Sequence, residues 1–84
     1  MLELYQAEGC PHSQDVREKL TELGLSYVAH NPRTPDDEVK NERTNAVLAE
    51  LGGQEQTPYL VDDARGEALY ESDAIVDYLE KHYA

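Results

Sequence analysis

Apolar and polar positions alternate with two different periods along the first third of the 84-residue chain. The mostly apolar run of residues 2–6 has the length and composition of a short β-strand. From Pro11 onward, apolar side chains recur every three or four positions until Gly24, a spacing that predicts a helix stopped by glycine. The run Leu25–Ala29 predicts a second strand, which returns beside the first through the helical crossover.

The same two periods return after a polar interruption. Two prolines break regular structure in His30–Glu42, although Asp36–Lys40 is compatible with the start of a helical turn. Apolar residues at helical spacing then predict a second helix, which stops at Gly52–Gly53. Two short apolar runs joined by a polar turn, Tyr59–Val61 and Glu67–Tyr70, predict a hairpin.

A third helix ends the chain. Ser72 is a good N-cap residue, Asp73 suits the first helical turn, and an apolar stripe continues to Tyr83. The order β-α-β-α-β-β-α predicts an α/β fold with a four-stranded mixed sheet and three helices on its faces. Eighty-four residues suffice for one small domain, which we expect to span residues 1–84.

Acidic residues dominate the charge of the chain. Eighteen aspartates and glutamates face seven lysines and arginines, so the net charge is −11. Phosphate groups would be repelled, and neither a nucleic acid nor an anionic membrane is an expected partner. The acidic runs Asp36–Glu38 and Asp62–Asp63 are expected to be solvated. The composition also resembles that of cytoplasmic proteins of salt-loving archaea, where salt screens self-repulsion; an ordinary acidic cytosolic domain is the alternative.

No segment has the pattern of a targeting signal or of a membrane span. The chain lacks a charged N-terminal stretch followed by an apolar one, and no apolar run is long enough to cross a bilayer. The single cysteine excludes an internal disulfide and fits a reducing compartment. We therefore expect a soluble cytoplasmic protein.

That cysteine, Cys10, lies where the first strand ends and the first helix begins. Thiolate is the reactive form of cysteine, and a helix N-terminus stabilises it through unpaired N–H groups and the helix dipole. Pro11 is favoured at the first helical position, which places Cys10 at or next to the N-cap. The alternative is a small buried hydrophobic residue, a common environment for a lone cysteine.

Three separated segments carry a resemblance to a known family: Leu4–Ser13, Gln56–Leu60 and Glu71–Leu79. In this order and with this spacing, they resemble the thioredoxin fold, and within it the glutaredoxins and the N-terminal domains of glutathione transferases. The resemblance covers essentially the whole chain. It implies that Cys10 is the catalytic nucleophile and that residues from the other two segments bind a small thiol.

The small-thiol site implied by the resemblance consists of Thr57, Pro58, Glu71, Ser72 and Asp73. The Thr57 backbone would pair with the cysteinyl part of a glutathione-like thiol, and the bond before Pro58 would be cis. A trans proline opening an edge strand is the alternative. Ser72 and the adjacent N–H groups would hold the α-carboxylate of a γ-glutamyl group, and Glu71 its ammonium group.

The chain departs from the family pattern at two places. Ser13 replaces the second cysteine of dithiol glutaredoxins, so only monothiol chemistry remains, and Ser13 is left to donate a hydrogen bond to the thiolate. The lysine that often precedes the motif is absent, and Glu8 would disfavour the thiolate at close range. His12 either stabilises the thiolate when protonated or points into water, and we favour the second.

The resemblance implies a monothiol glutaredoxin-like thiol–disulfide oxidoreductase, which reduces mixed disulfides between proteins and a low-molecular-weight thiol. No metal and no organic cofactor are needed, and the co-substrate would be glutathione or γ-glutamylcysteine. The missing lysine favours γ-glutamylcysteine, which lacks the glycyl carboxylate, unless Arg33, Lys40 or Arg43 replaces that lysine.

Other functions are less compatible with the sequence. Monothiol relatives can carry an iron–sulfur cluster between two subunits, but they usually have glycine after the cysteine, where this chain has Pro11. A noncatalytic thiol-binding module is a further alternative. Transferase activity is not expected, because 84 residues leave no room for the helical half of a transferase.

Overall fold

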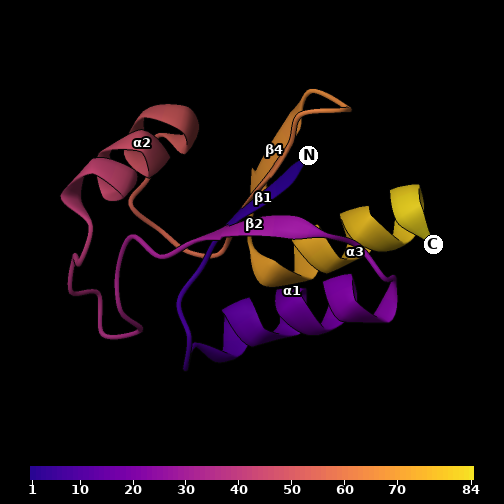
Figure 1. The fold of residues 1–84 in the computed structure, drawn as a ribbon, viewed down its shortest axis with the longest axis horizontal. Helices are drawn as coiled ribbons and strands as arrows, with labels where there is room; N and C mark the ends of the chain where they lie inside the picture. Colours follow the sequence, from indigo (N-terminus) through magenta and orange to yellow (C-terminus); the bar gives the residue numbers. More distant parts are fainter.

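A computed structural model describes residues 1–84 (Figure 1). The seven elements follow the predicted order: β1 Leu2–Tyr5, α1 Pro11–Glu22, β2 Tyr27–His30, α2 Glu42–Gly52, β3 Tyr59–Asp62, β4 Glu67–Tyr70 and α3 Ser72–Tyr83. The strands form one sheet in the order β2-β1-β3-β4. Strands β1 and β2 are parallel, and the other two pairs are antiparallel. The predicted α/β fold class with a four-stranded mixed sheet is therefore confirmed.

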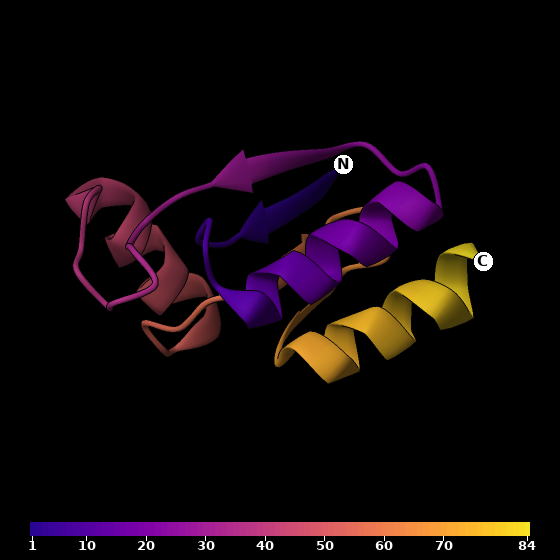
Figure 2. The same cartoon turned by 90° about the horizontal axis from the view of Figure 1, so that it is seen from below.

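The helices cover the sheet from opposite sides. Figure 2 shows α1 and α3 side by side on one face, with α2 displaced toward one end of the molecule. Alternate side chains of a strand point to opposite faces, so Leu2 and Leu4 of β1 pack toward α1 and α3. Tyr5 faces the other way and packs with Tyr59 and Leu48 of α2. None of the helices is long and apolar enough to cross a membrane.

The second strand starts two residues later than the sequence predicts. The N–H of Leu25 donates to the Leu20 carbonyl at 2.9 Å, and that of Gly24 donates to Thr21 at 3.1 Å. With Gly24 at φ +68°, these two bonds form a Schellman motif that closes the C-terminus of α1. Leu25 therefore belongs to the helix cap, and β2 begins only at Tyr27.

The expected helical turn at Asp36–Lys40 is absent. Arg33 and Val39 form an isolated antiparallel bridge across this segment instead. The Thr34 hydroxyl accepts hydrogen bonds from the N–H groups of Asp36, at 3.3 Å, and Glu38, at 3.2 Å. A threonine side chain that accepts from nearby backbone donors favours a turn over a helix, and that competition explains the error.

Asp62 is buried, contrary to the expectation that Asp62–Asp63 is solvated. Only 1% of Asp62 is exposed, whereas Asp63 does face solvent. The Asp62 Oδ2 accepts hydrogen bonds from the hydroxyls of Tyr78, at 2.8 Å, and Tyr83, at 2.7 Å. Its other oxygen, Oδ1, has no hydrogen-bond partner. Through these two hydrogen bonds, the carboxylate links the C-terminal half of α3 to the end of β3.

Candidate active site

Strand register brings three of the predicted site segments to one end of the sheet. Tyr5 is paired with Tyr59, and Tyr59 with Tyr70, so these residues form one row across three strands. The segment that follows β1 leads to Cys10, Thr57–Pro58 precedes β3, and Glu71 follows β4. The three connections therefore lie at the same end of the sheet, although the sequence separates them by up to 61 residues.

Cys10 occupies the N-cap of α1, as the sequence predicts. Its backbone is extended, with φ −90° and ψ 119°, and Pro11 begins the helix. The carbonyl of Cys10 accepts from the Gln14 N–H at 2.9 Å. Its thiol makes no capping hydrogen bond and is partly exposed. The sulfur therefore lies at the positive end of the helix dipole, within reach of a disulfide.

The Ser13 side chain contacts the loop before Cys10 and stabilises it. The Ala7 N–H donates to the Ser13 Oγ at 3.2 Å, and the Cys10 N–H donates to the Ala7 carbonyl at 3.3 Å. Ser13 is wholly buried, and no hydrogen bond joins its hydroxyl to the Cys10 sulfur. The expected hydrogen bond from Ser13 to the sulfur is therefore absent, and the contact that the hydroxyl does make is as an acceptor for the loop.

Thr57 and Pro58 form the second part of the site. The peptide bond between them is cis, as the resemblance implies. Pro58 is buried and Thr57 is half-buried. None of the protein's backbone hydrogen bonds uses the N–H or the C=O of Thr57. A backbone donor and a backbone acceptor are therefore available to a ligand beside the N-terminus of β3.

The start of α3 differs from the predicted capping pattern. Glu71, with φ +73°, occupies the N-cap, and its side chain makes no hydrogen bond to the helix. Ser72 is the first helical residue and does not cap α3. The N–H groups of Ser72 and Asp73 lie in the first turn, where intrahelical acceptors are lacking. Asp73 itself accepts from the Ala74 N–H at 3.0 Å.

Two side-chain contacts at this helix start were not foreseen. The Ser72 Oγ lies 3.4 Å from the His12 Nδ1, which joins the first turns of α3 and α1. The Gln56 Nε2 donates to the Glu71 Oε1 at 3.3 Å. His12 is exposed, as expected, but it contacts Ser72 rather than water alone. No sequence signal links residues 60 positions apart, so only the fold shows this pair.

The sequence matches the family model for the glutathione S-transferase N-terminal domain over residues 4–84. The chain belongs to this family. A search of curated proteins gives no match. A diazinon-metabolizing glutathione S-transferase of the silkworm, Bombyx mori, is 29% identical with a TM-score of 0.77, and the match covers 99% of this chain and 38% of that one.

Two further solved structures are similar. Glutathione transferase E6 from Drosophila melanogaster is 29% identical, with a TM-score of 0.76, over 100% of this chain and 36% of that one. A glutathione transferase from Phanerochaete chrysosporium, solved with oxidized glutathione, is 28% identical with a TM-score of 0.78, over 98% and 36%. The chain therefore spans less than two fifths of the length of these transferases.

A small pocket lies beside the cysteine loop of this glutathione S-transferase N-terminal domain. It has a volume of about 300 Å³, and its lining comprises Ala7, Glu8, Asn31, Arg33, Thr34, Pro35 and Lys40. The two cations in it are already paired. Arg33, whose side chain is 10% exposed, donates to the Asn45 Oδ1 and to the Glu55 carbonyl, and Lys40 pairs with Glu38. Neither is a free replacement for the missing lysine.

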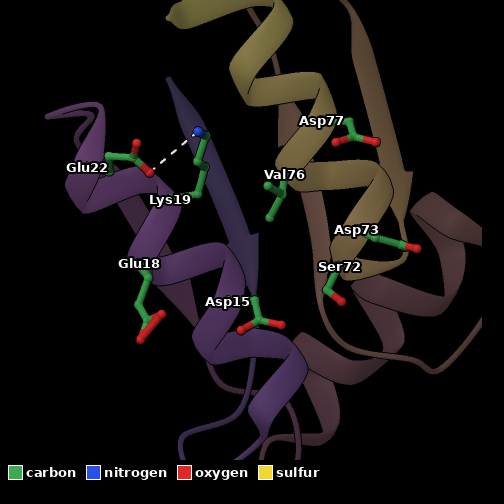
Figure 3. Close-up of a pocket in the computed structure, with 8 residues that line it drawn as sticks. All are labelled: Asp15, Glu18, Lys19, Glu22, Ser72, Asp73, Val76 and Asp77. Atoms are coloured by element: carbon green, nitrogen blue, oxygen red, sulfur yellow. Dashed lines mark hydrogen bonds and ion pairs between the residues drawn. The ribbon is translucent and has the colours of Figure 1, made fainter.

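A second concavity runs between α1 and α3 and borders the site at Ser72. Figure 3 shows the residues that line it, which are Asp15, Glu18, Lys19, Glu22, Ser72, Asp73, Val76 and Asp77; its volume is about 430 Å³. The only cation of this set, Lys19, pairs with Glu22 at 3.4 Å and with Glu80 at 2.6 Å. The side chains that line the groove therefore carry a net negative charge.

Proposed function

We propose that this domain is a monothiol glutaredoxin-like thiol–disulfide oxidoreductase, which reduces mixed disulfides between proteins and a glutathione-like thiol. One observation carries the proposal: a partly exposed thiol at a helix N-cap lies at the same end of the sheet as the unpaired backbone of Thr57. The thiol is a nucleophile, and the backbone is a strand-like binding edge for the cysteinyl part of the small thiol.

The reaction proceeds in two thiol–disulfide exchanges. The Cys10 thiolate attacks the small-thiol sulfur of the mixed disulfide; a new S–S bond forms, the old one breaks, and the substrate protein leaves as a thiolate that takes up a proton. A second small thiol, as its thiolate, attacks the small-thiol sulfur attached to Cys10. Its products are the oxidised small-thiol dimer and the regenerated Cys10 thiolate. The number of disulfide bonds is unchanged overall, because the sulfur of the free small thiol is oxidised as the substrate sulfur is reduced.

Residues at the start of α3 would select the γ-glutamyl end of the thiol. The unpaired N–H groups of Ser72 and Asp73 are donors at the positive end of a helix dipole, where a carboxylate is favoured. The adjacent Glu71 carboxylate would meet the ammonium group. This pairing of opposite charges matches a zwitterion, and the Phanerochaete relative was solved with oxidized glutathione.

Arg33 and Lys40 already form ion pairs and hydrogen bonds within the protein, which supports a preference for γ-glutamylcysteine over glutathione. Glutathione carries a glycyl carboxylate in addition, and no unpaired cation lines the pocket beside Glu8. An added carboxylate there would find no unpaired cation to bind. The preference follows from the same missing charge that the sequence reveals before the cysteine motif.

The binding site is tested by titrating Cys10→Ser protein, which cannot form a mixed disulfide, with reduced glutathione and with γ-glutamylcysteine. Amide NMR shifts are expected at Thr57, Glu71, Ser72 and Asp73, with tighter binding of γ-glutamylcysteine. Shifts confined to other residues would contradict the site. Clearly tighter binding of glutathione would contradict only the preference, because both thiols share the γ-glutamyl group.

Turnover is tested with a glutathionylated protein substrate, whose free thiol is quantified by mass spectrometry. Reduction is expected to depend on added small thiol, because Ser13 cannot resolve the mixed disulfide on Cys10. Absence of turnover with either thiol, by folded protein with reduced Cys10, would contradict the oxidoreductase proposal. Conjugation of the thiol to an electrophile without disulfide reduction would indicate transferase activity instead.

A further inference from the structure

A carboxylate lies in the tight turn immediately before the reactive cysteine. The Cys10 N–H donates to the Ala7 carbonyl, which closes the turn Ala7-Glu8-Gly9-Cys10, and Gly9 supplies the required positive φ of +84°. Glu8 occupies the second position of this turn, and its side chain is 75% exposed. Glu8 stands two residues before Cys10, and an unpaired negative charge near the sulfur would disfavour the thiolate and repel anionic reactants.

Arg17 pairs with this carboxylate. Its guanidinium, on the second turn of α1, lies 3.2 Å from the Glu8 Oε2, and the Arg17 side chain is 22% exposed. The same nitrogen donates to the Gln6 Oε1 at 2.5 Å. One guanidinium therefore contacts both ends of the segment that leads from β1 into the turn.

The Gln6 amide is fixed in turn by β2 and the residue that follows it. Gln6 is buried, its Nε2 donates to the Asn31 Oδ1 at 2.6 Å, and its backbone N–H donates to the His30 carbonyl at 2.9 Å. A hydrogen bond from an ionised donor to a buried, already oriented acceptor is stronger than an exposed ion pair. The guanidinium is therefore preorganised, and Glu8 meets a cation that is already in place.

We propose that Arg17 is a positioning residue for Cys10, which neutralises Glu8 and holds the Gln6–Gly9 loop against α1. The inference rests on the proposed function in one respect, that Cys10 is the nucleophile. Arg17 takes no part in bond exchange. It sets the local charge at the sulfur close to zero, although the whole chain carries −11. A mixed disulfide with a zwitterionic or anionic small thiol can then approach the thiolate without local repulsion.

The test compares the alkylation of Cys10 by iodoacetate, which is anionic, and by iodoacetamide, which is neutral. Both reagents attack the same thiolate, so the ratio of their rate constants cancels the thiolate fraction and reports the charge near the sulfur. Wild-type protein, Arg17→Gln, Glu8→Gln and the double variant form a charge series of 0, −1, +1 and 0 at this site. Arg43→Gln, an exposed arginine on α2, is the control for total charge.

At low ionic strength, Arg17→Gln is expected to lower the iodoacetate-to-iodoacetamide ratio about two- to fivefold, and Glu8→Gln to raise it by a similar factor. The double variant should return to near the wild-type ratio, and about 1 M salt should remove the differences. Because Glu8 is exposed, Glu8→Gln folds even if Arg17→Gln does not, and it alone still carries the prediction.

A purely structural role for Arg17 would give a different series. The double variant would then stay as impaired as Arg17→Gln, and Glu8→Gln would leave the ratio unchanged; either result would overturn the proposal. A shift in Arg43→Gln equal to that in Arg17→Gln would also overturn it, since total charge would then suffice. Alkylation needs no turnover, so failure of the oxidoreductase proposal leaves this result readable.

Discussion

Asp62→Ala is expected to lower the free energy of unfolding by about 2–4 kcal/mol, the largest loss for any single side chain outside the apolar core. The Asp62 Oδ2 accepts from the hydroxyls of Tyr78 and Tyr83, and the residue is 1% exposed. Removing the carboxylate deprives both hydroxyls of their acceptor and leaves a void at the end of β3. Hydrogen bonds to a charged group contribute more than neutral ones, which sets the magnitude.

Urea denaturation measures this loss, and Asp63→Ala is the matched control. Asp63 is the next residue, has the same side chain and is exposed, so its removal should change stability by no more than about 0.5 kcal/mol. Equal effects of the two substitutions would show that burial and the tyrosine bonds contribute nothing. Asp62→Asn should lie between them, because the amide keeps one acceptor but brings two donors into a buried site.

The pH dependence of stability has a definite sign at both ends of the range. Burial raises the pKa of Asp62, but the hydrogen bonds from Tyr83 and Tyr78, together with the backbone and the charge of Arg65, outweigh it, so the net pKa is lowered. Its stabilisation is therefore present above the unfolded value of about 3.9 and is lost as pH falls through the folded pKa. Burial and the bond to Asp62 raise the pKa of Tyr78 to about 12, so stability also falls as pH rises from 10 toward that value.

The same carboxylate shows where reasoning from the sequence stops. Periodicity is local, so the seven elements and their order were predicted, and the bounds of β4 are the predicted ones. Burial of an acidic residue depends on distant partners instead, and the tyrosines that bind Asp62 follow it by 16 and 21 positions. A doublet of aspartates in a turn gives no sign that one of them faces inward.

In the candidate site too, some features follow from neighbours in the sequence, whereas others depend on the tertiary fold. The position of Cys10 at a helix N-cap follows from neighbours in sequence, since Pro11 and the preceding strand determine it. The contact between His12 and Ser72 requires the first turns of α1 and α3 to lie side by side at one end of the sheet. The pairing of Glu8 with Arg17 requires the turn before Cys10 to fold back onto α1. Only the tertiary fold creates these contacts.

Cys10→Ser is expected to abolish turnover, by more than about 10³-fold, whereas Ser13→Ala should keep activity within about tenfold of wild type. The hydroxyl of serine is too weakly acidic to replace a thiolate, and no hydrogen bond of the Cys10 side chain is lost. Ser13→Ala removes the acceptor of the Ala7 N–H and leaves a buried donor unpaired, which costs about 1–2 kcal/mol of stability.

The contrast between these two variants decides whether the chemistry is monothiol. Both are assayed on a glutathionylated protein with added small thiol, well below their melting temperatures. Ser26→Ala is the control for loss of a serine, because Ser26 is exposed and lies outside the helices and strands, just before β2. Turnover by Cys10→Ser would move the nucleophile elsewhere. Complete loss of activity in folded Ser13→Ala would mean that the Ser13 hydroxyl acts on the thiolate. Loss of its hydrogen bond to the Ala7 N–H lowers stability, but it leaves the Cys10 sulfur at the helix N-cap.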